Sequence, residues 1–128
     1  MQKQIQAVQK FHETFGLGVS HEMKADLGVQ KNNLRFELMR EENEEYLDAV
    51  RDNDLIEIAD ALGDMLYILC GTIVEHGLQH KIEQVFDEIQ RSNMSKLGED
   101  GKPIYREDGK VLKGPNYKPA DLSDLVWT

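Results

Sequence analysis

Residues 54–76, with the sequence DLIEIADALGDMLYILCGTIVEH, decide the fold of this chain. The segment is apolar nearly all round, which is the pattern of a helix that other helices bury. It contains no lysine or arginine, yet its carboxylates at Glu57, Asp60 and Asp64 fall within about 60° of one another on a helix. We therefore predict a buried helix whose acidic side chains point inward.

A second acidic cluster comes just before this segment. Glu41, Glu42 and Glu45 fall within an arc of about 100° if residues 33–51 form a helix. Only a short connection separates that helix from residues 54–76, so the two are predicted to be antiparallel neighbours. This arrangement brings the two acidic clusters together.

Carboxylates that are buried without a basic partner must protonate, pair or bind a metal ion. Both clusters offer oxygen donors only, with no His or Cys among them, and such a set suits Mg²⁺, Mn²⁺ or Ca²⁺ better than zinc. We predict Mg²⁺ as the cofactor, with Mn²⁺ as the alternative. A solvated acidic helix face is the competing interpretation.

The predicted fold is all-α, an antiparallel bundle of about four helices in a single domain. Residues 1–97 make the bundle with its metal site, and residues 98–128 make an irregular tail that contains a small β-hairpin near residues 104–113. Apolar spacing places the helices at residues 2–15, 33–51, 54–76 and 78–93, with Asn32 or Asn33 capping the second, and Gly16 and Gly77 ending the first and third.

Apolar residues at helical spacing give the predicted inward faces. Those of the second helix are Leu34, Leu38, Tyr46, Leu47 and Val50, and those of the fourth are Ile82, Val85, Phe86 and Ile89. Cys70 has apolar neighbours, so we predict a core residue rather than a nucleophile. The polar start of the chain and the lack of a long apolar run predict a soluble, cytoplasmic protein.

The charge of the chain is unevenly distributed. A net charge of −9 argues against binding to nucleic acid polymers or to anionic membranes. Residues 91–118 are the exception, with seven basic residues against four acidic ones. An acidic metal-binding region followed by a basic tail suits a substrate that carries phosphate groups.

Several of these segments resemble one superfamily. Two acidic motifs of this chain resemble the paired motifs of the all-α nucleoside triphosphate pyrophosphohydrolases: Glu41-Glu42-Asn43-Glu44-Glu45 and Leu62-Gly63-Asp64-Met65-Leu66-Tyr67. That superfamily includes MazG-like, dimeric dUTPase-like and phosphoribosyl-ATP pyrophosphohydrolase members. Residues 85–96 and 109–113 are similar to later segments of MazG-like members. One departure is that Ala61 stands where the second motif has glutamate, and Asp60 or Glu57 is then the expected replacement.

The resemblance implies hydrolysis of a nucleoside triphosphate, preferably a deoxynucleoside triphosphate, to the monophosphate and pyrophosphate. Glu41 or Glu42 would accept the proton of the attacking water. The implied metal ligands are Glu41, Glu42, Glu45, Asp60, Asp64 and Glu57. The implied substrate-binding residues are Lys96, Lys110, Lys113, Asn93, Arg91, His12 and Phe11. Relatives of this kind form dimers or tetramers, so we also expect a homodimer or homotetramer.

Three alternatives stay open at this point. The first keeps the fold and changes the substrate to phosphoribosyl-ATP. The second is a non-catalytic acidic helical module for interaction or oligomerisation, which would leave Asp60 and Asp64 unexplained. The third is a ferritin-like di-iron protein, but that class requires Glu-x-x-His pairs and no histidine follows any of the six acids at that spacing.

Overall fold

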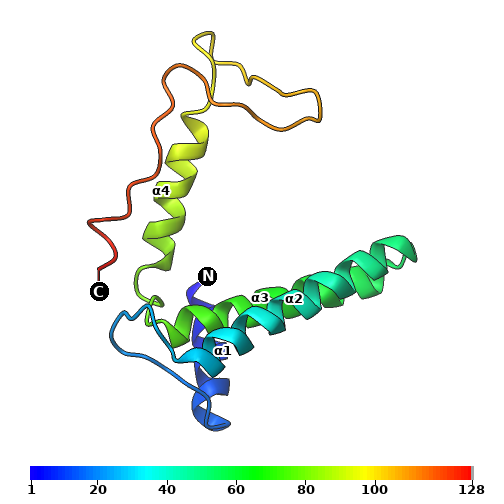
Figure 1. The fold of residues 1–128 in the computed structure, drawn as a ribbon, viewed down its shortest axis with the longest axis vertical. Coiled ribbons are helices and arrows are strands. Elements are labelled where there is room, and N and C mark those ends of the chain that lie inside the picture. The colour runs from blue at the N-terminus through cyan, green and yellow to red at the C-terminus, as the bar shows by residue number, and fades with distance from the viewer. Residues whose placement is uncertain (128) are drawn as a thin grey trace. The chain divides into compact units, whose positions relative to one another are not determined.

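The chain folds into helices joined by irregular segments, in a computed structural model that describes residues 1–127. The helices are α1 (Gln2–Thr14), α2 (Val29–Arg51), α3 (Leu55–Glu75) and α4 (Ile82–Met94) (Figure 1). In residues 1–127 the only β-structure is an isolated antiparallel bridge between Tyr105 and Val111. The predicted all-α class is confirmed.

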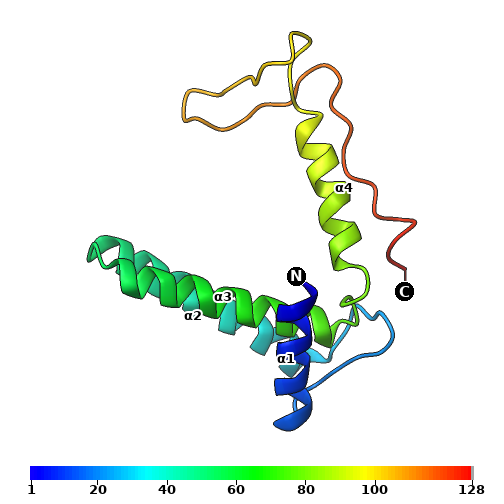
Figure 2. The same ribbon diagram turned by 180° about the vertical axis from the view of Figure 1, so that it is seen from behind.

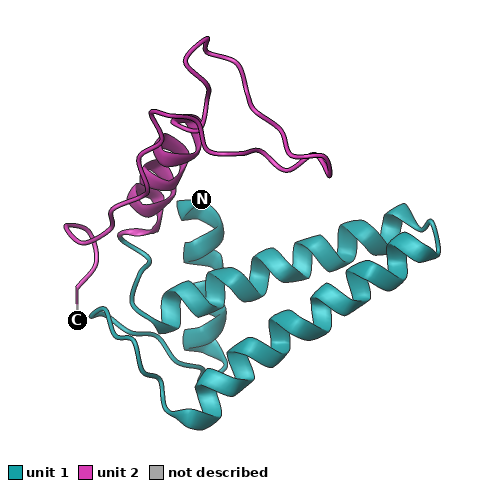
Figure 3. Ribbon diagram, turned by 45° about the horizontal axis from the view of Figure 1, so that its top comes forward, with its two compact units in different colours: residues 1–80, 128 teal, residues 81–127 magenta. Residues whose placement is uncertain are grey.

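Two compact units make up the described chain, residues 1–80 and residues 81–127 (Figure 3). In the first unit α2 and α3 lie side by side and antiparallel, and α1 packs against α3 (Figures 1 and 2). The predicted antiparallel neighbours are therefore confirmed. The division after residue 80 differs from the predicted boundary at residue 97, and the single domain stays a prediction.

Both ends of α3 are capped as the sequence indicates. The Asp54 side chain accepts a hydrogen bond from the backbone N–H of Glu57, which satisfies one free donor of the first turn. At the other end Gly77 has φ +72°, and the N–H of Leu78 reaches back to the carbonyl of Ile73. This is a Schellman ending, and it confirms Gly77 as the stop.

The predicted start of α2 is wrong by several residues. The helix begins at Val29, after Gly28 with φ +92°, and not at a cap formed by Asn32 or Asn33. The Asn32 side chain instead accepts a hydrogen bond from the N–H of Leu27 and donates one to Asp26. Asn32 thus supports the start of the helix from inside its first turn. The predicted start of the fourth helix is also wrong, because α4 begins at Ile82 and not at residue 78.

The core of the first unit is narrower than predicted. Its fully buried apolar side chains are Ile5, Val8, Cys70 and Val74, which confirms Cys70 as a core residue. In α2 only Ala49 is buried, and the predicted inward residues are exposed except Leu38, which is half-buried. The reason is that α2 packs mainly on α3, so only one stripe of its surface is covered. In α4, Phe86 and Ile89 are likewise exposed.

The second unit contains two copies of one turn after α4. In the first, the N–H of Gly101 donates to the Gly98 carbonyl and the Asp100 carboxylate accepts from the N–H of Lys102. The same pattern recurs eight residues later, and there it closes the Tyr105–Val111 bridge. The predicted hairpin is therefore present as a single bridged pair.

No helix within residues 1–127 has the length and apolar character needed to cross a membrane.

Candidate functional site

The α2–α3 pair places one glutamate among three other carboxylates. The charges of Glu45 on the same helix and of Asp60 and Asp64 on α3 act on the carboxyl group of Glu42 in α2. Its Oε2 atom is buried and has no hydrogen-bond partner. Burial, the neighbouring Glu45 carboxyl and the charges of Asp64 and Asp60 together raise the pKa of Glu42 to about 7. We call these four residues the acidic cluster.

The acidic cluster has no basic partner in the described part of the chain. Arg40, the nearest arginine in the sequence, pairs with Glu37 and Glu44 instead. Because Arg40 lies on another side of α2, the charge imbalance predicted from the sequence is real in the fold. No Lys or Arg among the described residues forms an ion pair with the acidic cluster.

The predicted inward direction of the acids is only partly correct. Asp64 is half-buried, whereas Glu57 and Asp60 are exposed, and so are Glu41 and Glu45. The position that the superfamily fills with glutamate, Ala61, is 2% exposed and lies in the packed part of α3. Asp60 rather than Glu57 is the α3 acid that acts on Glu42 beside Asp64.

The donor chemistry of the acidic cluster fits a divalent cation. It consists of carboxylate oxygens alone, which hard cations such as Mg²⁺ prefer, and one buried oxygen lacks a partner. Within residues 1–127, however, no three of these groups already converge as a formed metal site. Side chains of exposed residues such as Glu45 and Asp60 would therefore have to turn inward around an ion.

The predicted phosphate-binding residues all belong to the second unit. Arg91 donates to the carbonyl of Pro119 at 3.1 Å and pairs with Glu88. The Lys113 ammonium lies 4.9 Å from the centre of the Tyr117 ring. The side chains of Asn93 and Lys110 are exposed, and that of Lys96 is half-buried. Their roles toward a substrate stay predictions.

Phe11 and His12, the predicted base-binding residues, differ in exposure. His12 is 3% exposed, and its Nδ1 lies 2.8 Å from the carbonyl oxygen of Gly18. Phe11 is exposed and contacts the Tyr67 ring edge-on, with 5.6 Å between ring centres. The Phe15 ring is tilted against the Phe11 ring, with 4.5 Å between the two ring centres. Both base-binding roles stay predictions. Of the two side chains, only the ring of Phe11 is exposed to solvent.

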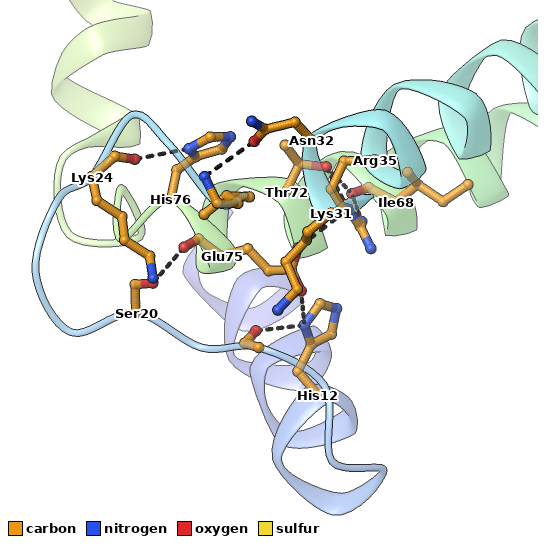
Figure 4. Close-up of polar contacts among 12 residues, drawn as sticks. His12, Ser20, Lys24, Lys31, Asn32, Arg35, Ile68, Thr72, Glu75 and His76 are labelled. Atoms are coloured by element: carbon orange, nitrogen blue, oxygen red, sulfur yellow. Dashed lines mark hydrogen bonds and ion pairs between the residues drawn. The ribbon is translucent and has the colours of Figure 1, made fainter. Parts of the chain in front are cut away.

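Sequence reasoning missed a second charged cluster, centred on Glu75 at the end of α3 (Figure 4). The Glu75 carboxylate is buried, with Lys31 Nζ at 3.6 Å and Arg35 Nε at 3.7 Å. His12 Nδ1 lies 3.9 Å from it. Burial lowers the pKa of the Arg35 guanidinium, and the Glu75 charge offsets part of that effect. The signal in the sequence was a lone acid in an otherwise apolar stretch.

Comparison with known proteins places the chain in a family. Residues 8–93 match the model of the phosphoribosyl-ATP pyrophosphohydrolase family. The chain belongs to this family. The matched residues include both acidic segments and end near the end of α4, so the family match covers only the first three residues of the basic region 91–118.

Two individual proteins are similar to the chain. It is 40% identical over 130 residues to the uncharacterized protein L479 of Acanthamoeba polyphaga mimivirus, with 92% of this chain and 52% of that protein covered. The chain thus spans about half the length of this relative. A crystal structure of a candidate NTP pyrophosphohydrolase from Exiguobacterium sp. 255-15 is 28% identical, covers 91% of this chain and 88% of its own, and has a TM-score of 0.48.

Proposed function

We propose that this protein is a metal-dependent nucleotide pyrophosphohydrolase. It converts a nucleoside triphosphate, preferably a deoxynucleoside triphosphate, to the monophosphate and pyrophosphate, with Mg²⁺ as cofactor and the cytoplasm as location. The observation that supports this most is the unpaired, buried oxygen of Glu42 among Glu45, Asp60 and Asp64. Family membership supports the same reaction class.

The four carboxylates of the acidic cluster would hold the metal. When bound, Mg²⁺ offsets phosphate charge, orients the phosphate chain and makes a bound water more acidic. Glu41 or Glu42 acts as the general base and accepts a proton from the attacking water. A general base is most effective when its pKa lies near the working pH.

The tail residues have the chemistry to bind the leaving pyrophosphate. The ammonium groups of Lys96, Lys110 and Lys113 can each donate a charge-assisted hydrogen bond to a phosphate oxygen. Arg91 and Asn93 complete the predicted substrate-binding set in the same unit.

An exposed aromatic group is the proposed contact for the nucleobase. Tyr67 lies one turn after Asp64 on α3, and Phe11 and Phe15 extend its surface. Base stacking on an aromatic side chain contributes about 1–3 kcal/mol. His12 is 3% exposed and contacts the Gly18 carbonyl and Glu75, so it also holds α1 in place.

Phosphoribosyl-ATP is the second candidate substrate, and the description of the matched family favours it. It presents the same triphosphate chemistry to a metal and basic side chains, so the acidic cluster suits both substrates equally. The two candidates differ at the base, which in phosphoribosyl-ATP carries a second ribose phosphate. The aromatic contact alone does not distinguish them.

The test is pyrophosphate release from a panel of nucleoside triphosphates and from phosphoribosyl-ATP, with Mg²⁺ and with a chelator. We expect activity only with metal, and a loss of roughly 100-fold or more in Glu42→Gln and Asp64→Asn, because each change removes a carboxylate that would hold the metal. Glu44→Gln is the matched control, since Glu44 is exposed, on the same helix, and paired with Arg40.

Activity that survives both substitutions, or that needs no metal, would refute the mechanism. A folded protein that leaves every substrate intact would favour the non-catalytic interaction module.

A further inference from the structure

The tail of the second unit contains the same tetrapeptide twice. Residues 99–102 and residues 107–110 both have the sequence Glu-Asp-Gly-Lys, and both follow α4 in the chain (Figure 1). Each copy holds an exposed aspartate directly before a glycine, at Asp100 and at Asp108. Because the two sequences are identical, a difference in the reactivity of the two aspartates must come from the structure around them.

The backbone of the two turns is hydrogen-bonded in the same way. In the first copy the N–H of Gly98 donates to the Lys102 carbonyl at 2.8 Å, and the N–H of Gly101 donates to the Gly98 carbonyl at 2.9 Å. Residues 106–110 repeat both hydrogen bonds at the same two lengths. Gly101 and Gly109 have φ of +75° and +88°, and nothing lies within 4 Å of a methyl group added to either. The two glycines therefore have the same open surroundings.

The two aspartates differ in the groups that bind their carboxylates. Among the described residues, the carboxylate of Asp100 accepts a hydrogen bond only from the N–H of Lys102, at 3.0 Å. Asp108 accepts the corresponding N–H of Lys110 at 3.2 Å, and Arg106 also donates to both of its oxygens. The Arg106 guanidinium lowers the pKa of the Asp108 carboxyl group. The first copy has glycine at the position of this arginine, so Asp100 has no such partner.

An aspartate before a glycine can react with its own backbone. The glycine nitrogen attacks the side-chain carboxyl carbon, so that a C–N bond forms and a C–O bond breaks. The oxygen leaves as water and takes the amide proton and the carboxyl proton with it. Water then opens the five-membered imide: cleavage at the side-chain carbonyl restores aspartate, and cleavage at the main-chain carbonyl gives isoaspartate. Glycine favours ring closure because it has no Cβ to restrict the backbone.

We propose that Asp100 is a site of isoaspartate formation and that the ion pair with Arg106 protects Asp108 from the same reaction. The guanidinium keeps the Asp108 carboxyl group in its charged form, which the glycine nitrogen attacks poorly because no water can leave. It also binds both carboxylate oxygens, so the carboxyl carbon turns toward the nitrogen of Gly109 only after the ion pair breaks. Asp100 has neither restraint, and a single hydrogen bond to a backbone N–H holds it.

Isoaspartate at this position would change the turn that connects α4 to the bridged pair of Tyr105 and Val111. The hydrogen bond from the Gly98 N–H to the Lys102 carbonyl joins the two ends of that turn. Isoaspartate lengthens the main chain between them by one methylene group, which weakens this hydrogen bond. Since the reaction releases and consumes only water, it needs neither metal nor nucleotide and is separate from the proposed function.

The test is incubation of the folded full chain in H₂¹⁸O at neutral pH, without metal or nucleotide. Each passage through the imide leaves one heavy oxygen atom at the site, and tandem mass spectrometry of peptides locates it. We expect roughly twofold to fivefold more label at Asp100 than at Asp108, the size of effect that an exposed ion pair supports. Endoproteinase Asp-N, which cleaves before aspartate but not before isoaspartate, should lose cleavage at Asp100 over the same time.

Two controls separate the structure from the sequence. In urea the two tetrapeptides should take up label equally, because the Arg106 ion pair is then lost. Arg106→Gln should raise the label at Asp108 to that of Asp100 in the same folded molecule, with unchanged helical circular dichroism. Equal label at the two sites in the folded wild type would overturn the proposal. So would unchanged label at Asp108 in Arg106→Gln, or a difference between the sites that persists in urea.

Discussion

Arg35 and Glu75 meet inside the first unit, with Arg35 Nε 3.7 Å from Glu75 Oε2. The same guanidinium donates to the Thr72 hydroxyl at 3.0 Å and to the Ile68 carbonyl at 2.7 Å. Since His12 approaches the other carboxylate oxygen, this contact joins all three helices of the unit. It fixes the start of α2 and the end of α1 against the last turns of α3.

Glu75→Ala should destabilise the protein by about 3 kcal/mol, because it leaves the largely buried Arg35 guanidinium without its carboxylate partner. We take the low end of the usual range, since the pairs are 3.6–3.9 Å long. Urea unfolding at neutral pH measures the change. Glu44→Ala removes an exposed ion pair with Arg40 and should cost no more than about 0.5 kcal/mol. Equal losses in the two variants would contradict the assigned burial.

Gly71→Ala should destabilise the protein by about 1–3 kcal/mol, because the added methyl group would lie 2.6 Å from Arg35 Nη2 and 2.7 Å from His12 Nε2. Gly63→Ala on the same helix is the matched control. Nothing lies within 4 Å of its added methyl group, and alanine favours a helix over glycine by about 1 kcal/mol. Thermal unfolding should therefore shift in opposite directions, and a stabilising Gly71→Ala would show that the site has free space.

The helices and their antiparallel pairing were predictable because caps, glycine stops and apolar spacing act locally. The Asp54 side chain caps the start of α3, and Gly77, with its positive φ, ends it. The start of α2 was not predictable in the same way, since Asn32 acts from within the helix on the preceding loop. The sequence around Asn32 does not show whether its side chain caps the helix or, from within the helix, binds the preceding loop.

Burial was harder to predict than helix formation. The apolar pattern of α3 indicates that most of its surface is buried by other helices, but it does not show which helices bury it. In a single chain α1 covers one side only, so Leu62 and Leu69 stay exposed. The acidic cluster was predicted from spacing, whereas the Glu75 cluster depends on His12, Lys31 and Arg35, which are distant in sequence.

Glu42→Gln should stabilise the metal-free protein at high pH and have little effect at low pH. The pKa of Glu42 is about 7 when folded, against an ordinary 4.5, so the folded state holds the proton more tightly than the unfolded state. Stability of the wild type therefore falls as pH rises from about 4.5 to about 7, and glutamine removes that fall. Thermal unfolding in a chelator at pH 4.5 and pH 8 measures this. Parallel pH curves for the two proteins would contradict the prediction.

Lys110→Ala should lower kcat/KM for the triphosphate by roughly 10-fold to 100-fold, the usual loss for one hydrogen bond to a charged group of about 1.5–3 kcal/mol. Lys102→Ala is the matched control, because Lys102 has the corresponding position in the first copy of the same turn. Pyrophosphate release at limiting substrate measures both. Equal losses would show that the tail contributes general charge and not a specific contact at Lys110.

Ala61→Glu restores the glutamate of the superfamily motif and tests whether the acidic cluster binds metal. The position is 2% exposed and shares α3 with Asp60 and Asp64, so the added carboxylate should destabilise the metal-free protein by about 2 kcal/mol. Mg²⁺ should reverse the loss, since an ion at 100 times its dissociation constant stabilises by about 2.7 kcal/mol. Ala61→Gln keeps the size without the charge and should gain less from Mg²⁺, because only the four carboxylates of the acidic cluster then bind the ion. If Mg²⁺ stabilises neither variant in thermal unfolding, the carboxylates of α2 and α3 do not form the metal site, and the catalytic assignment of Glu42 fails with it.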